Sequence, residues 1–542
     1  MKSLLLLLLL ASLPAWAQVD TWTFAYPVSD ANGLMDVATG NDGAVYITGR
    51  FTDSLQLGST RLTSPGLCLY IAKCDPKGRV LRVTKLRGAT DVLPYSIAVD
   101  RAGNSYVTGT VRGKLVYNQG RDSTVQLSAA GSNAFTLKCR ANGAVAWIRR
   151  GEGSTGPQAG SGGGEGIAVD ATGNSYVTGT VSGTNVRFGT RTFGPRYQQA
   201  FLVSYTPEGA LRWANVWTGL NPNDRSSSHG GGVALNSAGD CYVSGTFATG
   251  LTLDGLTLQS PDGQGHLFLA RFDKWQGQLQ WAVVPAGGGN GRGVATSRQG
   301  DAYLVGSFVG TATYGSTTLT SAGDADGFVA CYNPQGTVKW ATAVGGRDYD
   351  VAIDIAVTPK SGKAYVTGLL DLTSQSTNRA FLLKLTRRGR IRQQELVAGP
   401  GTSTGANLAL GSQGNIYSAG IFTNSCGFGS IILNSAVTQG FFGCFGSQAA
   451  QYKEAKTPLA VSVFPNPAQS KFTLRLTGAE QAVRATLYDR LGNALAVHTL
   501  PPATAATNAD SAFDTSALPN GLYTLRLEFG KQTTSRTINV QH

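Results

Sequence analysis

The sequence predicts an all-β fold, a seven-bladed β-propeller closed by the N-terminal strand and followed by a small C-terminal β-sandwich. Glycine is abundant, at 71 of 542 residues, and charged residues make up only 14%, as expected for many short strands and tight turns. A Gly-x-x-Tyr-x-x-Gly core recurs along most of the chain, and a different strand pattern follows it. These three observations predict a repeat domain at residues 18–450, a linker at 451–458 and a second domain at 459–542.

The first 17 residues have the pattern of a signal peptide. Lys2 gives a positive start, Leu4 to Leu10 form an apolar run, and Ala15-Trp16-Ala17 is a small-x-small cleavage site. The apolar run is too short to span a bilayer. We therefore expect the protein to leave the cytoplasm, with no transmembrane segment in the mature chain.

The tyrosine of the repeated core marks seven units, with 52 to 70 residues between successive tyrosines. The tyrosines are Tyr46, Tyr106, Tyr176, Tyr242, Tyr303, Tyr365 and Tyr417. Residues 100–110 and 170–180 are nearly identical copies. Repeats of this length indicate stacked structural units.

Each unit divides into four short strands. An apolar strand such as 167–170 is followed by an Asp-x-x-Gly turn and a second strand such as 176–180. The third strand resembles 134–138, and the fourth carries a tryptophan after a glycine turn, as at Trp147. A single four-stranded sheet cannot bury both faces, so we expect the sheets to pack radially, as in a propeller.

The two ends of the repeat region predict ring closure. The last unit has its third strand at 440–444 but no following Gly-x-x-x-Trp strand. The mature chain begins with 19–24, which contains Trp22 and has no strands before it. We expect this N-terminal strand to complete the seventh blade, which would remove an exposed sheet edge.

The core Asp-x-x-Gly-Asn-x-Tyr-Val-Thr-Gly at 100–109 and 170–179 resembles the SBBP-type β-propeller repeats of secreted bacterial proteins. The resemblance covers residues 19–446 and is weaker at 411–420, where Tyr-Ser-Ala-Gly replaces Tyr-Val-Thr-Gly. It implies a propeller fold outside the cytoplasm and no single activity.

The segment 459–542 has its own strands, with alternating apolar and polar residues at 472–476, 485–488 and 521–527. Alternation of this kind is typical of half-buried strands, and several in a short segment predict a small sandwich.

Three motifs occur in order within this segment: Val-Phe-Pro-Asn-Pro at 463–467, Leu-Tyr-Asp-Arg-Leu-Gly at 487–492 and Leu-Pro-Asn-Gly-Leu-Tyr at 518–523. They resemble the type A C-terminal sorting domain of the type IX secretion system. The resemblance assigns the sorting motif to Pro465, Asn466, Pro467, Asp489, Gly492, Gly521 and Tyr523.

That resemblance implies a Bacteroidota-type host, the type IX secretion machinery as a partner, and passage through the periplasm and across the outer membrane. It also implies removal of the domain and, often, attachment to surface lipopolysaccharide. Arg536 lies somewhat early for the basic residue that such domains often carry near the end. Release and surface attachment therefore both stay open.

The formal net charge is +13, with a pI near 9.4. The basic residues are scattered rather than clustered on one element, so we expect no nucleic-acid partner. Surface glycans or anionic polymers are the partners that such a charge favours in an exported protein. Among the seven cysteines, Cys74 and Cys139 occupy packing positions and are expected to be buried thiols, whereas a bridge between Cys426 and Cys444 stays open.

The sequence contains four histidines and no Gly-x-Ser-x-Gly elbow, P-loop or Rossmann fingerprint. Asp324 and Asp326 form only a fragment of a calcium loop. We therefore expect no enzymatic activity, no cofactor and no metal site.

Any ligand site is expected where loops converge on one face of the ring. The least repetitive loop residues are Arg149, Arg150, Trp217, His229, Arg292, Arg347 and Tyr349. Arginine together with aromatic rings suits anionic or sugar-like ligands. The sequence thus predicts a secreted or cell-surface binding or adhesion module; the alternatives are a polysaccharide hydrolase or lyase with carboxylates in the funnel, or a purely structural surface protein.

Overall fold

The computed structural model describes residues 20–28, 36–118, 124–152, 162–183, 185–194, 197–219, 227–260, 265–371, 378–446, 460–479, 482–489, 493–529 and 532–542. The chain divides into two compact units, Met1–Ala450 and Gln451–His542. The predicted signal peptide (1–17) and linker (451–458) lie outside the described residues. Regular structure in the described residues consists of strands, and no helix in them has the length and apolarity needed to cross a bilayer.

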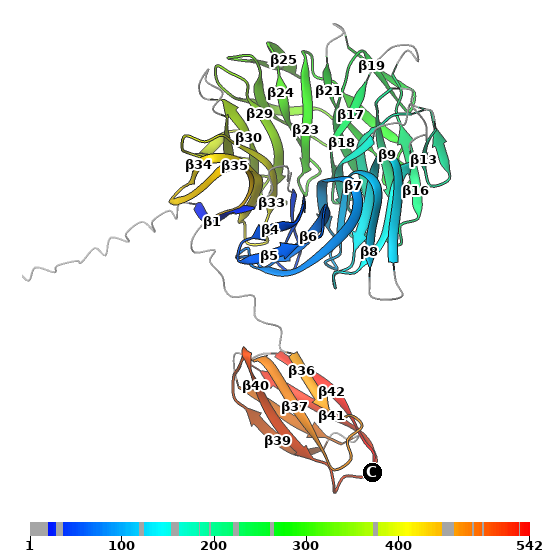
Figure 1. Cartoon of the computed structure of the whole chain (residues 1–542), viewed down its shortest axis with the longest axis vertical. Helices are drawn as coiled ribbons and strands as arrows, with labels where there is room; N and C mark the ends of the chain where they lie inside the picture. Colours follow the sequence, from blue (N-terminus) through cyan, green and yellow to red (C-terminus); the bar gives the residue numbers. More distant parts are fainter. Residues whose placement is uncertain are drawn as a thin grey trace, which may run out of the picture. The chain divides into compact units, whose positions relative to one another are not determined.

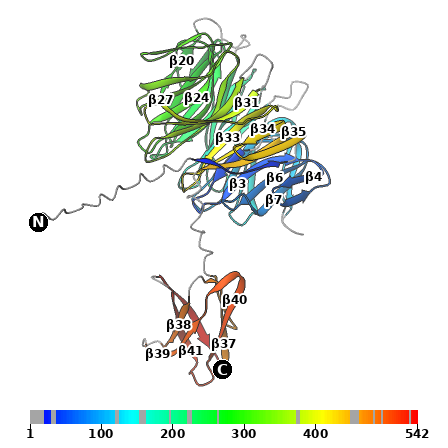
Figure 2. The same cartoon turned by 90° about the vertical axis from the view of Figure 1, so that its left-hand side faces the viewer.

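The first unit is a set of four-stranded antiparallel arrangements that follow one another around a common centre (Figures 1 and 2). The first strands of these arrangements are β2 (Asp36–Thr39), the second part of β7 (Val80–Val99), β11 (Gly162–Val169), β17 (Ser228–Leu235), β23 (Gly289–Thr296), β29 (Val351–Val357) and β33 (Ser403–Leu410). The second strands are β3 (Val45–Phe51), β8 (Ser105–Asn118), β12 (Ser175–Val181), β18 (Cys241–Phe247), β24 (Ala302–Phe308), β30 (Ala364–Asp371) and β34 (Ile416–Phe428).

The third and fourth strands complete each arrangement on its outer side. The third strands are β6 (Cys68–Cys74), β9 (Thr124–Cys139), β15 (Gln199–Tyr205), β21 (His266–Phe272), β27 (Asp326–Tyr332), β31 (Asn378–Leu385) and β35 (Ile431–Gly446). The fourth are the first part of β7, β10 (Val145–Glu152), β16 (Leu211–Val216), β22 (Leu279–Val283), β28 (Val338–Val344) and β32 (Ile391–Leu396), with β1 (Thr21–Val28) beside β35. The first strands contact one another in the order β2, β7, β11, β17, β23, β29, β33 and back to β2.

Two features go beyond the predicted four short strands. Strand β7 is shared, since its first part pairs with β6 and its second part with β8. Short hairpins also stand between second and third strands: β4 (Ser54–Leu57) with β5 (Thr60–Thr63), β13 (Val186–Phe188) with β14 (Arg191–Phe193), β19 (Gly250–Leu253) with β20 (Leu256–Gln259), and β25 (Thr311–Tyr314) with β26 (Thr317–Thr320). The variable stretches of the repeat thus form structure of their own.

The repeated tyrosine and tryptophan join neighbouring sheets. The Tyr106 hydroxyl donates to the Gly173 carbonyl at 3.0 Å, and that of Tyr303 donates to the Gly362 carbonyl at 3.1 Å, each in the next unit along the chain. The indole nitrogen of Trp147 donates to the carbonyl of Pro207 in the following unit at 3.0 Å. Both residue types are buried apolar groups with a polar end, which allows them to pack and to satisfy a turn carbonyl together.

Strand β1 pairs antiparallel with β35, from Thr21 opposite Gly446 to Val28 opposite Gly440. Its Phe24, opposite Cys444, has the place that Trp147 has opposite Lys138 in β9. The Phe24 ring also covers the turn glycine Gly78, as tryptophans do in other units. Trp22, the tryptophan of the N-terminal strand, therefore does not have the repeat position: it lies two residues before Phe24, on the other side of a β-bulge that β10, β16, β22 and β28 share.

All seven cysteines are free and buried. Cys74 and Cys139 are buried thiols, as predicted. Cys426 lies opposite Leu433 and Cys444 lies opposite Tyr417 in the β34–β35 pairing, so these two cysteines do not bridge the hairpin.

The second unit consists of two antiparallel sheets. One has the order β36 (Ala460–Phe464), β37 (Lys471–Ala479) and β40 (Ala503–Asp514); the other has β39 (Ala494–Leu500), β38 (Val483–Tyr488), β41 (Gly521–Phe529) and β42 (Gln532–Val540). Alternate residues such as Phe472, Leu474 and Leu476 enter the core that the sheets share. The alternation read from the sequence is thus the inward and outward alternation of a sandwich.

Candidate functional site

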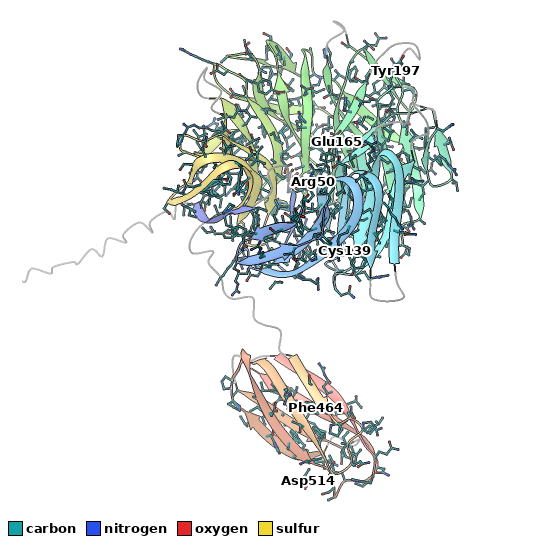
Figure 3. The ribbon with its side chains drawn as sticks, viewed as in Figure 1. Arg50, Cys139, Glu165, Tyr197, Phe464 and Asp514 are labelled. Atoms are coloured by element: carbon teal, nitrogen blue, oxygen red, sulfur yellow. The ribbon has the colours of Figure 1, made fainter. Side chains whose placement is uncertain are left out.

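A cavity of about 620 Å³ opens among the first strands of the first unit. It is lined by residues of β7, β11, β17, β23, β29 and β33, together with Thr110, Ser132, Thr180 and Gln198. Glu165, one of the lining residues, lies near the centre of the ring of sheets, whereas Tyr197 lies toward the periphery (Figure 3). The cavity therefore occupies the central channel of the propeller.

A β-bulge in each of these strands determines which side chains line the channel. Near the channel, the pairing of a first strand with its second strand skips one residue, or two in β23, and β7 has two further bulges at Gly88 and Thr90. The residues skipped near the channel all line the cavity: Tyr95, Glu165, Gly231, Arg292 with Gly293, Ile353 and Ala406. A bulge commonly redirects a side chain out of the ladder, and here it does so toward the channel.

Glu165, Thr180, His229 and Arg292 form a cluster in the cavity. The Thr180 hydroxyl lies 3.4 Å from the Glu165 carboxylate, to which it donates, and 3.1 Å from Nδ1 of His229. Because the hydroxyl has one proton, donation to Glu165 requires the His229 Nδ1–H to donate to Thr180. This tautomer leaves Nε2 of a neutral His229 as an acceptor.

Burial and Arg292 set the charge states of the cluster. Burial raises the pKa of Glu165 above its ordinary value, and the nearby Arg292 charge opposes that rise. Burial, followed by the charge of Arg292, lowers the pKa of His229. His229 is therefore neutral at pH 7, and Arg292 is the fixed positive charge of the cluster.

Two aspartates lie at equivalent places in the first strands β2 and β29, opposite Thr48 and Thr367, and Asp354 of the two lines the cavity. Asp36 accepts backbone N–H groups of Val37 at 2.7 Å and of Ile97, in the neighbouring β7, at 2.6 Å. Asp354 does the same with Ile355 and with Leu408 of β33, both at 2.8 Å. Each carboxylate thus links two adjacent first strands.

The pKa of both aspartates is raised. For Asp36, burial and then the charge of Asp354 raise the pKa to about 7, despite the N–H donors that lower it. For Asp354, burial raises the pKa to about 6. The cavity-lining Asp354 carboxyl therefore has a pKa well above the ordinary aspartate value.

Of the seven predicted ligand residues, His229 and Arg292 line the cavity. Arg149 instead packs over the Trp147 ring and donates to the Gly209 carbonyl at 2.7 Å, and Arg150 pairs in β10 opposite Phe135. Arg347 and Tyr349 are exposed in the connection between β28 and β29, outside this cavity. The seven residues do not form one site.

Trp217 corrects the prediction most plainly. Its ring is 2% exposed and stacks on Phe272 at 5.1 Å between ring centroids. A ligand in solution therefore cannot reach it. A residue that follows a strand can be part of the core even in a non-repeating segment.

Sequence reasoning missed Glu165, Tyr95 and the two aspartates. They lie inside the repeated first strands, which read as packing positions, and only the bulge turns some of them into the channel. The run Gly162-Gly-Gly-Glu165-Gly166 was the one available signal, since a charged residue among glycines is unusual for a strand. Within the described ranges, no three His, Cys, Asp or Glu side chains come together as a metal site requires.

In the second unit, the predicted sorting residues stabilise turns. Asn466 donates to the Thr537 carbonyl at 3.0 Å, and the Asp489 carboxylate accepts the Asn493 N–H at 2.9 Å. The Tyr523 hydroxyl donates to the Pro519 carbonyl at 2.7 Å. Gly521 begins β41, Pro465 and Pro467 flank Asn466, and Gly492 lies outside the described residues.

Two family models match the chain. Residues 462–541 match the secretion system C-terminal sorting domain, and residues 87–110 match the beta-propeller repeat called SBBP. A search of curated proteins finds no match.

Several solved structures share a distant likeness with the chain. BamB from Moraxella catarrhalis matches at 11% identity and a TM-score of 0.33, over 80% of this chain and 98% of that one. A polysaccharide lyase described as PL25 ulvan lyase matches at 9% identity and 0.40, over 74% and 91%. PorZ of Porphyromonas gingivalis, a surface component of the type IX secretion system, matches at 9% and 0.22, over 94% and 81%. These scores are too low to transfer any property to this chain.

The sorting domain indicates export, with either attachment at the cell surface or secretion. It also implies interaction with the secretion system. The chain therefore carries an SBBP β-propeller repeat in its first unit and a type IX C-terminal sorting domain in its second.

Proposed function

We propose that this protein is an exported binding module whose propeller channel holds an acidic sugar residue of a surface glycan. The observation that carries the proposal is Arg292. It lines the cavity, and its guanidinium makes no salt bridge within the part of the chain that the structure describes. A guanidinium in a cavity suits a carboxylate, which can accept two of its N–H groups.

The other lining groups favour a sugar over a simple anion. Glu165 accepts hydrogen bonds, while Thr180, Tyr95 and His229 can donate or accept them. A bare anion would meet the Glu165 carboxylate unfavourably, whereas a sugar hydroxyl can donate to it. A carboxylated sugar satisfies both Arg292 and Glu165.

The test is a titration of the mature chain with acidic oligosaccharides and with neutral ones of the same length. We expect saturable binding of the acidic compounds, weakened about tenfold or more by Arg292→Gln, which corresponds to at least about 1.4 kcal/mol. Arg347→Gln is the matched control, because Arg347 is an exposed arginine outside the cavity. Equal loss in both variants, or no preference for acidic compounds, would contradict the proposal.

A second candidate function is cleavage of an acidic polysaccharide in the same channel. The hydrogen bonds that place Thr180 between Glu165 and His229 favour it, because a raised carboxyl pKa and a lowered histidine pKa are typical of acid–base pairs. Product release in the titration, abolished by His229→Ala, would replace the binding proposal with this one. Binding without product supports a module that is not an enzyme.

We also propose that the channel is formed by a ring of seven four-stranded blades. In this ring, β1 is the fourth strand of the seventh blade. The antiparallel register between Thr21–Val28 and β35 supports it. The ion pair between Asp20 and Lys384, at 2.5 Å, also supports it by joining the N-terminal end to β31 of the preceding sheet. A closed ring holds the channel residues of distant repeats at fixed positions.

A further inference from the structure

A second cavity, of about 490 Å³, lies toward the other end of the same first strands. In β11, Gly162 lines the first cavity and Val169 the second; in β17, His229 lines the first and Leu235 the second. Its wall consists of the ends of β7, β11 and β17, the turns that follow β2, β7, β11 and β17, and Arg212, Lys274 and Trp275. We propose that Trp275 is the stacking platform for a sugar ring in this second cavity, a site separate from the channel cluster.

The turn that carries Trp275 is longer than its counterparts. In other units the first residue of the turn between third and fourth strands donates its N–H to the carbonyl four residues on, as Thr206 does to Ala210 and Asn333 to Thr337. Between β21 and β22 the bond runs five residues, from Asp273 to Gln278. One residue has therefore been added to a repeated turn.

In this turn, the neighbours of Trp275 make the contacts with the tryptophan of the preceding unit. The Lys274 carbonyl accepts the indole N–H of Trp213 at 3.4 Å and a guanidinium N–H of Arg212 at 2.9 Å. Gly277 lies against the Trp213 ring. These are the roles that Pro207 and Gly209 have toward Trp147. The fold therefore does not need the side chain of Trp275.

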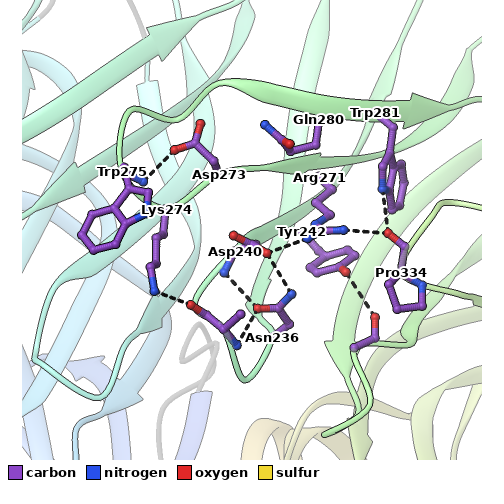
Figure 4. A network of polar contacts seen from close by, with 12 residues as sticks. Asn236, Asp240, Tyr242, Arg271, Asp273, Lys274, Trp275, Gln280, Trp281 and Pro334 are labelled. Atoms are coloured by element: carbon purple, nitrogen blue, oxygen red, sulfur yellow. Dashed lines mark hydrogen bonds and ion pairs between the residues drawn. The ribbon is translucent and has the colours of Figure 1, made fainter.

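Trp275 is 72% exposed, and its backbone N–H bonds to Asp273 while its indole N–H donates to nothing in the described part of the chain. The repeat tryptophan Trp281, at the opposite side of Figure 4, donates instead to Pro334 at 2.9 Å. Among the tryptophans of the described ranges, Trp275 alone is exposed. A large apolar ring that packing does not require, at the edge of a cavity, indicates a binding role.

The surroundings of the ring select the ligand class. The Lys274 ammonium lies 4.7 Å from the centre of the Trp275 ring and is fixed by a 2.6 Å bond to the Ala238 carbonyl (Figure 4). This positive charge disfavours cationic ligands on the ring. Asn41 and Arg101 are exposed lining residues whose side chains make no hydrogen bond or ion pair within the described residues.

A sugar ring matches this arrangement, because its C–H face is apolar and can stack on an indole while its hydroxyls bond polar groups at the rim. Asn41 can both donate to and accept from hydroxyls, and Arg101 can donate. Arg101 and Lys274 also tolerate acidic substituents on the sugar. The cavity therefore fits one residue of a neutral or acidic glycan.

The experiment applies the mature full-length chain to an array of neutral and acidic oligosaccharides. We compare the native chain with Trp275→Ala, Trp275→Phe, Arg292→Gln and, as a control, Tyr349→Ala, which removes an exposed aromatic ring outside both cavities. At least one glycan is expected to bind about tenfold or more weakly to Trp275→Ala, with partial retention in Trp275→Phe. Tyr349→Ala should leave that glycan's binding unchanged.

Iodide quenching of tryptophan fluorescence provides a direct readout of the ring itself. Because Trp275 is the exposed tryptophan among the residues that the structure describes, the bound glycan should protect against quenching in the native chain and not in Trp275→Phe. If every glycan signal survives Trp275→Ala, or if the array shows no binding, the proposal is overturned. Loss of binding in Arg292→Gln alone would support the channel proposal and overturn this one, so the two can fail separately.

Discussion

Single residues at the bulges decide the chemistry of the channel. The repeat supplies the same strand several times, and the skipped position is Tyr95 in one copy, Glu165 in another and Arg292 in a third. In the copies where it is Gly231 or Ala406, the wall has no functional group. A regular fold thus carries an irregular site because the residue outside the strand pairing differs from copy to copy.

The charge of the channel is expected to change with pH. His229 is protonated at a lower pH than an ordinary histidine, whose pKa is 6.5, because its pKa is lowered. Glu165 is protonated at a higher pH than an ordinary glutamate because its pKa is raised. Both changes make the cavity more positive. We therefore predict that an acidic oligosaccharide binds more tightly at about pH 5 than at about pH 7.5, measured by calorimetry at both pH values. Glu165→Gln should flatten this dependence; an unchanged profile would remove Glu165 from the site.

The raised pKa values of Asp36 and Asp354 predict how the free energy of unfolding changes with pH. Their folded pKa values, about 7 and about 6, lie above the ordinary value of 3.8, so between these limits the folded state holds protons that the unfolded chain releases. The contribution of the two carboxyl groups to the free energy of unfolding is fully present below about pH 4. It should fall as the pH rises, by about 1.4 kcal/mol per pH unit for each retained proton.

Urea titrations at several pH values measure this slope. Asp36→Asn should reduce it, even though the variant loses one acceptor and is less stable overall. Asp324→Asn is the control, since Asp324 is an exposed loop residue. A native chain whose stability rises over this interval would contradict the assigned shifts.

At the scale of one sheet, the glycine that ends the repeated core allows two close approaches at once. A Cβ on Gly245 would lie 2.1 Å from the His229 carbonyl oxygen and 2.7 Å from the Phe268 ring. Gly109, Gly306 and Gly420 meet a first-strand carbonyl in the same way. The core motif is therefore a packing requirement between first, second and third strands.

Gly245→Ala is predicted to destabilise the first unit by about 3 kcal/mol or more, because the backbone of β17 cannot move away without disturbing the ring. Gly265→Ala, in the same repeat, is the matched control. Its Cβ would meet only the Thr246 methyl at 3.7 Å, an ordinary contact, so we expect a change below about 1 kcal/mol. Denaturant unfolding of both variants makes the comparison, and similar losses would contradict the packing argument.

For the whole propeller, the proposed closure makes β1 indispensable. Trp22 is 6% exposed and contacts Phe428 and Phe445 with centroids 4.9 and 5.7 Å apart, so removal of β1 would uncover these rings and leave β35 as an open edge. A chain that lacks residues 18–28 is predicted to aggregate or to unfold at a markedly lower temperature, as seen by size-exclusion chromatography and calorimetry.

Removal of 460–542 is the control for that truncation. The second unit has its own core, so the main thermal transition of the first should persist without it. A stable monomer after loss of residues 18–28 would contradict the proposed closure.

The sequence by itself determined the class of fold, the repeat, and the sorting domain. Local signals carry these features: the Asp-x-x-Gly turns, the recurring tyrosine, the alternation in 472–476, and the ordered motifs near the end. Each depends on neighbours within a few residues, so spacing along the chain is enough to read it. Even the packing role of Cys74 and Cys139 followed from comparing repeats.

Only the tertiary structure decided which residues share a site. Glu165 and Arg292 are more than a hundred residues apart and meet because bulges in β11 and β23 face one channel, whereas Trp217 is taken into the core. Phe24 rather than Trp22 fills the repeat position because β1 pairs with β35 in the same bulged register as β10, β16, β22 and β28 have with their third strands. Register and bulges arise from pairing between distant strands, and local sequence does not specify such pairing.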